Sequence, residues 1–471
     1  MAAAAKMLRL RLIGFGLCGV VLAWLVLSRS LAAYLADGAP QAALWLNRRE
    51  PTALLNLADR AINAPLAPSV APAGGAPQAL QPRQSGGAEP TALLPADAAR
   101  ASGAERDFAE FGMIDPKAGI DLPAVRAWAE AAVLSDPLNA RALRILGQTA
   151  GAAGDIAAAA RLMQMAAQRS LHQSIAVYWL LAHSAESNDY KATLTYADVI
   201  LRTLPGFDAF VMPALARIAG DGNAVGLLKA SLADDPPWRS AVLQNLPRAV
   251  VDERILLDIF VALRRSRHPP TAAELDAYLS FLVERRMYEL GYYTWLQFLR
   301  PDQLADAGLL YNGDFELPLS GAPFDWHIEQ GFGVSIDVAE RPDKSGDHAL
   351  SLAFESGRVE YHSVKQLLML TPGRYQLRVR YKGELIGSRG LKWRLACAEN
   401  PERPFAETAM INGRAAEWSD IDLDFGVPAD GCRAQYLSLD LDARMPSEQF
   451  VSGTVWFDDL RIQRLASASR E

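Results

Sequence analysis

Two aromatic side chains of this sequence are predicted to point outward from β-strands. Trp418 and Tyr436 each share the strand phase of polar and acidic neighbours. The residues in phase with them are Asp420, Asp422 and Asp424 for Trp418, and Ser438, Asp440 and Asp442 for Tyr436. Because successive side chains of a strand point to opposite faces, both rings are predicted to face solvent. An exposed ring can stack on the C–H face of a sugar without burying charge, which makes Trp418 and Tyr436 candidate carbohydrate-binding residues.

Basic residues gather on one outer face of the same region. Arg378 and Arg380 share a strand face with Arg374 and Lys382. Adjacent and unpaired, these charges would repel one another across the sheet. Two arrangements avoid this repulsion. Either acidic strands interleave with the basic strand, or the basic face binds an anionic ligand such as a uronic-acid polymer, in which case Arg378 and Arg380 also contact carbohydrate.

The cysteines predict a disulfide bond. Cys18 lies in an apolar N-terminal segment, whereas Cys397 and Cys432 both lie in the predicted β region. Zinc would need two further ligands, and no histidine lies at metal-ligand spacing from either cysteine. A Cys397–Cys432 disulfide would stabilise the region by roughly 3–4 kcal/mol. A pair of buried free thiols is the alternative.

The sequence indicates a protein that is not an enzyme. It contains no GxSxG, GxxxxGK, HExxH or CxxC motif, and its six histidines are scattered. Gly14–Gly19 matches GxGxxG, but the match lies in an apolar segment without the strand that a dinucleotide site requires. No carboxylate pair stands out for glycoside cleavage. The formal charge of −7 gives no basis for nucleic-acid binding, because that needs a clustered positive face.

The region 308–466 is predicted to be a two-sheet sandwich. Apolar and polar residues alternate in 375–382, 421–425 and 437–442, and turn-forming segments separate these runs. Each such strand has one buried face. Some eight to ten strands of this kind form an all-β domain.

This region resembles the jelly-roll carbohydrate-binding modules of the galactose-binding-like type. The resemblance rests on Asn312–Glu316 at one end, Trp456–Leu460 at the other, Trp326, and the loop Ser345–Leu350. It implies that the first and last strands lie side by side, and that Trp326 packs in the core.

Such modules often carry a structural calcium ion at these strands. The resemblance therefore implies that Glu316, Asp458 and Asp459 are calcium ligands, since hard cations prefer carboxylate oxygens. The alternative is that these acidic residues end an edge strand in water.

The region 105–307 is predicted to be a helical repeat array. Gly154-Asp155 and Asn188-Asp189 are 34 residues apart, and Gly220-Asp221 follows. This period resembles that of tetratricopeptide helix pairs. Further helices are predicted at 253–265, 272–284 and 288–299, without the 34-residue period, as a cap that joins the array to the β domain.

The N-terminal region predicts a membrane anchor over residues 1–35. Leu12–Leu27 is entirely apolar, and three basic residues precede it. The basic flank places the rest of the chain outside the cytoplasm. Cleavage after Ala32, as in a signal peptide, is the alternative. A short helical segment, 36–64, and a flexible linker rich in Ala, Pro and Gly, 65–104, follow the anchor.

The order of anchor, linker, repeats and jelly roll resembles membrane-anchored periplasmic proteins of bacterial exopolysaccharide or surface-polysaccharide assembly systems. The resemblance implies a single-pass inner-membrane protein with its bulk in the periplasm. It implies that the repeats bind polysaccharide-assembly proteins and that the β module binds polysaccharide. A pure protein-interaction scaffold is a second interpretation, and a glycan hydrolase or lyase is a third.

Overall fold

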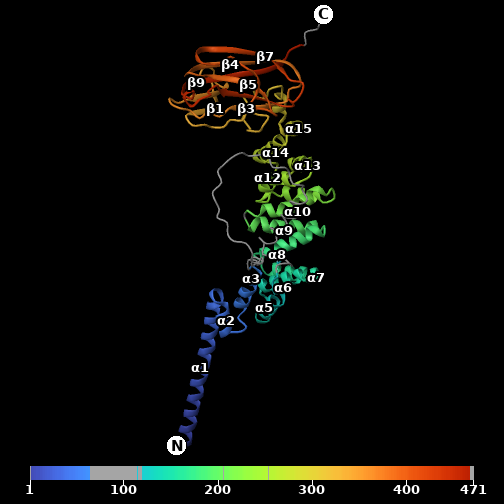
Figure 1. Cartoon of the computed structure of the whole chain (residues 1–471), viewed down its shortest axis with the longest axis vertical. Helices are drawn as coiled ribbons and strands as arrows, with labels where there is room; N and C mark the ends of the chain where they lie inside the picture. Colours follow the sequence, from blue (N-terminus) through green and yellow to red (C-terminus); the bar gives the residue numbers. More distant parts are fainter. Residues whose placement is uncertain (1, 64–113, 115–118, 205, 253, 467–471) are drawn as a thin grey trace, which may run out of the picture. The chain divides into compact units, whose positions relative to one another are not determined.

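The computed structural model describes residues 2–63, 114, 119–204, 206–252 and 254–466. The chain forms two compact units, Met1–Leu228 and Lys229–Glu471 (Figure 1). The first is helical. The second contains helices and a C-terminal antiparallel β-sandwich, as the sequence predicts.

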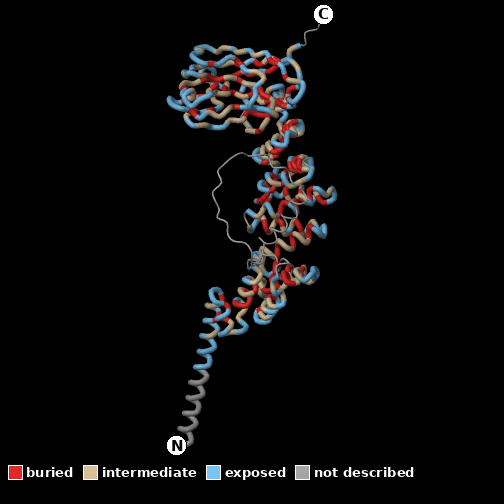
Figure 2. The backbone as a smooth tube through the Cα atoms, in the orientation of Figure 1, coloured by how far each residue is buried: buried red, intermediate tan, exposed pale blue. Residues whose placement is uncertain are grey.

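The N-terminal helix α1, Ala2–Gly38, has the properties of a membrane span. Among the described residues, its part Gly19–Gly38 is the one helical stretch long and apolar enough to cross a membrane. Figure 2 shows that the part of this helix from Gly19 on is largely exposed, and the side chain of Trp24 is 69% exposed. Exposed apolar side chains suit a lipid environment, although a signal sequence has the same properties.

Helices α2, Pro40–Leu46, and α3, Pro51–Ile62, each begin with proline, which is favoured in the first helical turn. Helix α3 packs against α5, Leu122–Ser135, and α6, Ala140–Ala152. Its Leu54, Leu55 and Ala58 are buried in that contact. The segment 36–64 therefore belongs to the packed helical unit. The linker predicted at 65–104 lies outside the described residues.

Helix pairs repeat at the predicted interval in the first unit. Helices α6, α8 and α10 begin at Ala140, Ser174 and Asp208, so they start 34 residues apart. The bounds of the following helices are α7 Ile156–Arg169, α8 Ser174–Glu186, α9 Tyr190–Thr203, α10 Asp208–Gly220 and α11 Val225–Ala233.

The repeated dipeptides explain the turns within these pairs. Gly154 and Asn188 have positive φ angles of 83° and 59°, a conformation that ends a helix. The next residues, Asp155 and Asp189, begin the following helices by accepting hydrogen bonds from backbone amides, at 2.9 and 3.1 Å. The equivalent dipeptides thus terminate one helix and cap the next.

Short helices precede the sandwich in the second unit. Their bounds are α12 Arg239–Ala249, α13 Arg254–Arg264, α14 Ala272–Glu284, α15 Tyr288–Phe298 and α16 Pro301–Ala305. Three of them match the helices predicted at 253–265, 272–284 and 288–299. The buried side chains of Arg239 and Glu274 form an ion pair of 2.7 Å between α12 and α14.

Nine strands within the described residues form the sandwich. One sheet has the order β1-β2-β9-β4-β7, and the other has the order β3-β8-β5-β6. The strands are β1 Val334–Glu340, β2 His348–Phe354, β3 Val364–Leu368, β4 Gly373–Gly387, β5 Leu391–Cys397, β6 Pro404–Glu407, β7 Gly413–Val427, β8 Gln435–Leu441 and β9 Val451–Arg464.

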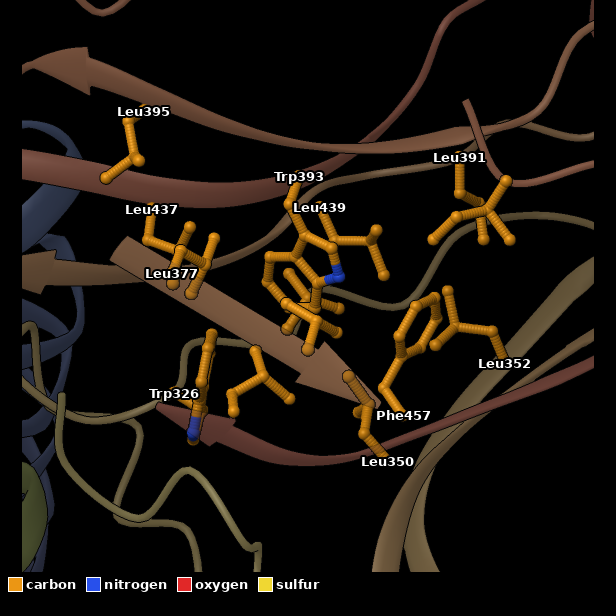
Figure 3. Packing of buried hydrophobic residues seen from close by; sticks show 14 of the residues in the cluster. Trp326, Leu350, Leu352, Leu377, Leu391, Trp393, Leu395, Leu437, Leu439 and Phe457 are labelled. Carbon is orange, nitrogen blue, oxygen red and sulfur yellow. The ribbon is translucent and has the colours of Figure 1, made fainter. Parts of the chain in front are cut away.

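Aromatic and aliphatic side chains from both sheets fill the space between them (Figure 3). Trp326 is fully buried, as the resemblance implies, and Trp393 is fully buried beside it. Their rings lie 5.8 Å apart, and Trp393 also contacts Phe457 of β9 edge to face. This cluster holds the two sheets together and fixes which strand faces point outward.

The segment Asn312–Glu316 lies beside β9, as the resemblance implies, but it is not a strand. The amide of Leu460 donates a 2.8 Å hydrogen bond to the carbonyl of Gly313. A Cβ atom at position 313 would lie 2.1 Å from the Leu460 carbonyl oxygen, so only glycine fits there. Asn312 and Phe315 have positive φ angles of 51° and 56°, which interrupt an extended conformation.

Candidate functional site

The outer face of the five-stranded sheet carries an interleaved ladder of basic and acidic residues. Strand β7 pairs with β4 so that Asp422 lies opposite Arg378 and Asp420 lies opposite Arg380. Arg378 donates two hydrogen bonds to Asp422, at 2.7 and 3.1 Å, and these bonds lower the pKa of Asp422. Arg380 donates a 2.7 Å bond to Asp459 of β9. The acidic strands thus neutralise this basic face, which is the first of the two predicted arrangements.

Trp418 lies on the same outer face but is packed among charged residues. Its Nε1 donates a 2.6 Å hydrogen bond to Asp343. The guanidinium groups of Arg341 and Arg380 lie 4.3 and 5.6 Å from its ring centroid. The ring is half-buried. A sugar that stacked on the face covered by Arg341 would have to displace that arginine.

Arg341 joins three carboxylates next to Trp418. Its guanidinium donates bonds of 2.7 Å to Asp347, 2.8 Å to Asp458 and 3.1 Å to Asp343. The hydrogen bonds from Arg341 and Trp418 lower the pKa of Asp343. Burial raises the pKa of Asp458 to about 6, and the charge of Arg341 opposes that rise.

The three predicted calcium ligands have separate partners. Glu316 accepts a 2.7 Å hydrogen bond from the backbone amide of His348. Asp458 binds Arg341, and Asp459 binds Arg380 and Arg461. No group of three or more His, Cys, Asp or Glu residues is arranged to hold a metal ion in the described part of the chain. Calcium binding stays a prediction, and it requires Asp458 to exchange Arg341 for the ion.

Trp456 is a further outward-facing aromatic residue that the sequence analysis missed. It lies on β9 between Ser351 of β2 and Lys382 of β4. Its neighbours Val455 and Phe457 are buried in the core, so the half-buried Trp456 points to the outer face. The alternation of Val455, Trp456 and Phe457 carries this signal in the sequence.

Tyr436 lies on the other sheet. It is half-buried on the outer face of β8, and it packs beside a cluster that joins α14 and α15 to the sandwich. Trp418 and Tyr436 therefore lie on opposite outer faces of the sandwich. They cannot line one groove.

A pocket lies next to Tyr436, between α14 and the four-stranded sheet. Its volume is about 250 Å³. Its lining combines an aromatic ring with hydroxyl, carboxyl, imidazole and ammonium groups. The lining residues are Asp276, Ser280, Val283 and Glu284 of α14, Gly321, Pro323 and His327 of the segment before β1, Lys365 of β3, and Tyr436 of β8. Such a combination of apolar surface and convergent polar groups is typical of a small-ligand site.

The predicted disulfide is present. Cys397 at the end of β5 is bonded to Cys432, which precedes β8. The bond reinforces the pairing of β5 with β8, the strand that carries Tyr436.

Structural comparison finds carbohydrate-binding modules similar to the C-terminal β region. A CBM4 module is 16% identical with a TM-score of 0.26, covering 33% of this chain and 99% of that chain. A putative sugar-binding protein from Bacteroides thetaiotaomicron is 11% identical with a TM-score of 0.25, covering 33% and 99%. The module TmCBM61, solved with β-1,4-galactotriose, is 17% identical with a TM-score of 0.23, covering 33% and 98%. No protein-family model and no curated protein matches the chain.

Proposed function

We propose that this protein is a non-catalytic, membrane-anchored scaffold whose β-sandwich binds polysaccharide. The observation that carries the proposal is the outward placement of aromatic side chains on the sandwich. Trp418 and Trp456 lie on the outer face of one sheet, and Tyr436 lies beside a pocket on the other. These rings are partly exposed, and aromatic surface next to hydrogen-bonding groups is what sugar recognition needs.

The helical unit supports the scaffold part of the proposal. Its helix pairs begin every 34 residues, and in this they resemble tetratricopeptide repeats. Stacked helix pairs form extended surfaces that suit the binding of other proteins. We assign partner binding to this unit, with polysaccharide-assembly proteins as the partners. From the resemblance in domain order, we further propose a role in exopolysaccharide or surface-polysaccharide assembly, on the periplasmic side of the inner membrane.

A pure protein-interaction scaffold is the second candidate, and one observation favours it. The ion pairs of Arg378 and Arg380 neutralise the face on which an acidic polymer was predicted to bind, and Arg341 covers Trp418. A sheet face whose charges are already paired offers little to an anionic glycan. In this alternative the sandwich docks a protein.

Affinity gel electrophoresis of the full-length protein in detergent tests polysaccharide binding. Gels containing neutral or acidic polysaccharide are expected to retard the wild type. Each stacked ring contributes on the order of 1 kcal/mol, so Trp456→Ala and Tyr436→Ala should each weaken binding at their own face about fivefold, and the double variant should be weakened at both faces. Trp418→Ala measures whether the ring beside Arg341 also contributes.

The control is Tyr293→Ala, because Tyr293 is an exposed aromatic residue on α15 that does not line the pocket. It should leave retardation unchanged. A wild type that no polysaccharide retards would overturn polysaccharide binding and leave the protein-interaction scaffold as the better interpretation.

A further inference from the structure

We infer that the pocket between α14 and the four-stranded sheet binds one non-anionic glycosyl residue, either neutral or amino-substituted. The inference rests on the proposed function and specifies its ligand. It also adds a helix outside the sandwich to the binding site, because α14 supplies one wall of the pocket.

Residue spacing places the polar groups of that wall on one helix face. Asp276, Ser280 and Glu284 are four residues apart in α14, so they lie one above another along the helix. All three line the pocket with Tyr436 and Lys365 of the sandwich. A ligand in the pocket would thus contact the helix and the sheet together.

The wall is held in place by a buried cluster, so the pocket is preformed. Leu279, the neighbour of Ser280, is fully buried. It belongs to a cluster with Trp295 of α15, Phe324 and Leu367. The ring of Trp295 lies 5.7 Å from that of Phe324, and it lies 4.9 Å from that of Tyr311, edge to face. A preformed site loses little conformational entropy when it binds a ligand.

The pocket offers complementary groups for a sugar ring. Tyr436 supplies an aromatic surface for the C–H face. The ammonium group of Lys365 lies 6.0 Å from the centroid of that ring and can donate hydrogen bonds to hydroxyl oxygens. Ser280 and Asp276 can accept hydrogen bonds from hydroxyl or ammonium groups. The pocket, at about 250 Å³, is smaller than the sites that hold drug-sized ligands, and its size suits a single ring.

The charges around the pocket determine the class of sugar. Two carboxylates, Asp276 and Glu284, face one ammonium, Lys365, and the imidazole of His327. Glu284 lies at the exposed rim, 3.7 Å from Arg248. Asp276 is deeper, where burial raises its pKa. Because Arg248 neutralises Glu284, Asp276 is the carboxylate that a uronate would meet. Asp276 would repel a uronate and bind a hydroxyl or ammonium group.

Equilibrium dialysis of the full-length protein in detergent tests the inference. The probes are labelled oligosaccharides of neutral hexose, of glucosamine and of galacturonate. The wild type should bind the first two at least tenfold more tightly than the third. Ser280→Trp fills the pocket without removing a core residue, and it should reduce this binding at least tenfold.

Asp276→Asn should weaken glucosamine binding more than neutral-hexose binding, because only the ammonium group loses a charge partner. This conservative variant keeps the test valid if the bulky Ser280→Trp impairs folding. The control Tyr293→Ala should bind as the wild type does.

Three outcomes are distinguishable. Binding that is unchanged in both pocket variants, while gels still retard the protein, would overturn the pocket and leave polysaccharide binding to the opposite sheet. Tighter binding of galacturonate would overturn the assignment of a non-anionic ligand. No binding of any probe or polysaccharide by the wild type would overturn the inference and the proposed function together.

Discussion

Arg341 neutralises a group of acidic residues beside the five-stranded sheet. It is nearly buried, and it binds Asp343, Asp347 and Asp458 at once. Asp458 is also buried, so without a partner its charge would be strongly unfavourable. Arg341 therefore stabilises the folded sandwich more than an exposed ion pair would.

Replacing Arg341 should destabilise the sandwich. Arg341→Ala leaves the Asp458 carboxylate buried without its cation, which costs about 3 kcal/mol of the free energy of unfolding. The expected result is a lower melting temperature in calorimetry. Arg461→Ala is the control, because the exposed Arg461 side chain pairs only at the surface and should change stability by less than about 1 kcal/mol. Equal effects of the two changes would contradict this role for Arg341.

Calcium binding makes a separate prediction at the same residues. If Glu316, Asp458 and Asp459 hold calcium, millimolar calcium should raise the melting temperature by mass action. The gain should be largest in Arg341→Ala, where no guanidinium competes for Asp458, and Asp458→Ala should abolish it. Melting curves that chelator and calcium leave unchanged in both proteins would rule out the site.

Strand phase predicted which face of its own strand a side chain occupies. It gave the outward direction of Trp418 and Tyr436, while the resemblance indicated the core position of Trp326 and cysteine usage indicated the Cys397–Cys432 disulfide. Phase alone gives no strand order. It could not show that β7 lies beside β4, or that Tyr436 lies on the opposite sheet from Trp418. The contact of Arg341 with the buried Asp458 was missed because the two residues are 117 apart in the sequence.

Helix α3 is the element that connects the end of α1 to the helix pairs. Asn56 and Arg60 donate hydrogen bonds of 2.9 Å to the carbonyl groups of Ala36 and Asp37. Asp59 of the same helix forms ion pairs of 2.6 Å with Arg141 and 2.7 Å with Arg144. Helix α3 thus packs with α1 and with α6, which lies after the 65–104 region in the sequence.

Cutting the chain within 65–104 should not separate its two parts. A site for a specific protease inserted there would leave α3 bound to α5 and α6 through buried leucines, each worth about 1.5–3 kcal/mol, and the Asp59 ion pairs. The C-terminal fragment should stay in the membrane pellet after cleavage. Leu55→Asp should release it, because Leu55 is 1% exposed.

The matched control is Trp45→Asp on α2, whose side chain is 87% exposed. It should leave the cleaved fragments together. Release of the C-terminal fragment from the otherwise unchanged protein would show that 65–104 alone connects the two parts, as a flexible linker does.

Element prediction succeeded where local signals were strong. The 34-residue period and its Gly-Asp and Asn-Asp turns gave the helix pairs, and the apolar periodicity gave α13, α14 and α15. The docking of α3 had no local signal. Its apolar face, Leu54, Leu55 and Ala58, predicts that α3 packs against another element. It does not identify α5 and α6 as that element.

The whole molecule combines an apolar N-terminal helix, helix pairs and a β-sandwich. Composition and periodicity were sufficient to predict this order. The pocket between α14 and the four-stranded sheet could not be predicted. It forms because α14 and β8 lie side by side, although about 150 residues separate them in the sequence. A polysaccharide bound there would be held by a chain that is itself fixed to a membrane, if α1 is retained.

Whether α1 stays on the mature protein determines where the protein acts, and we expect it to be retained. The exposed apolar surface of Gly19–Gly38 is long enough to span a bilayer, and three basic residues precede the apolar run Leu12–Leu27. The protein should stay in membranes after an alkaline carbonate wash, and a reporter active only in the periplasm should work when fused after residue 466. A soluble protein that begins after Ala32 would show cleavage of a signal peptide. An inactive reporter on a membrane-bound protein would place the helix pairs and sandwich in the cytoplasm.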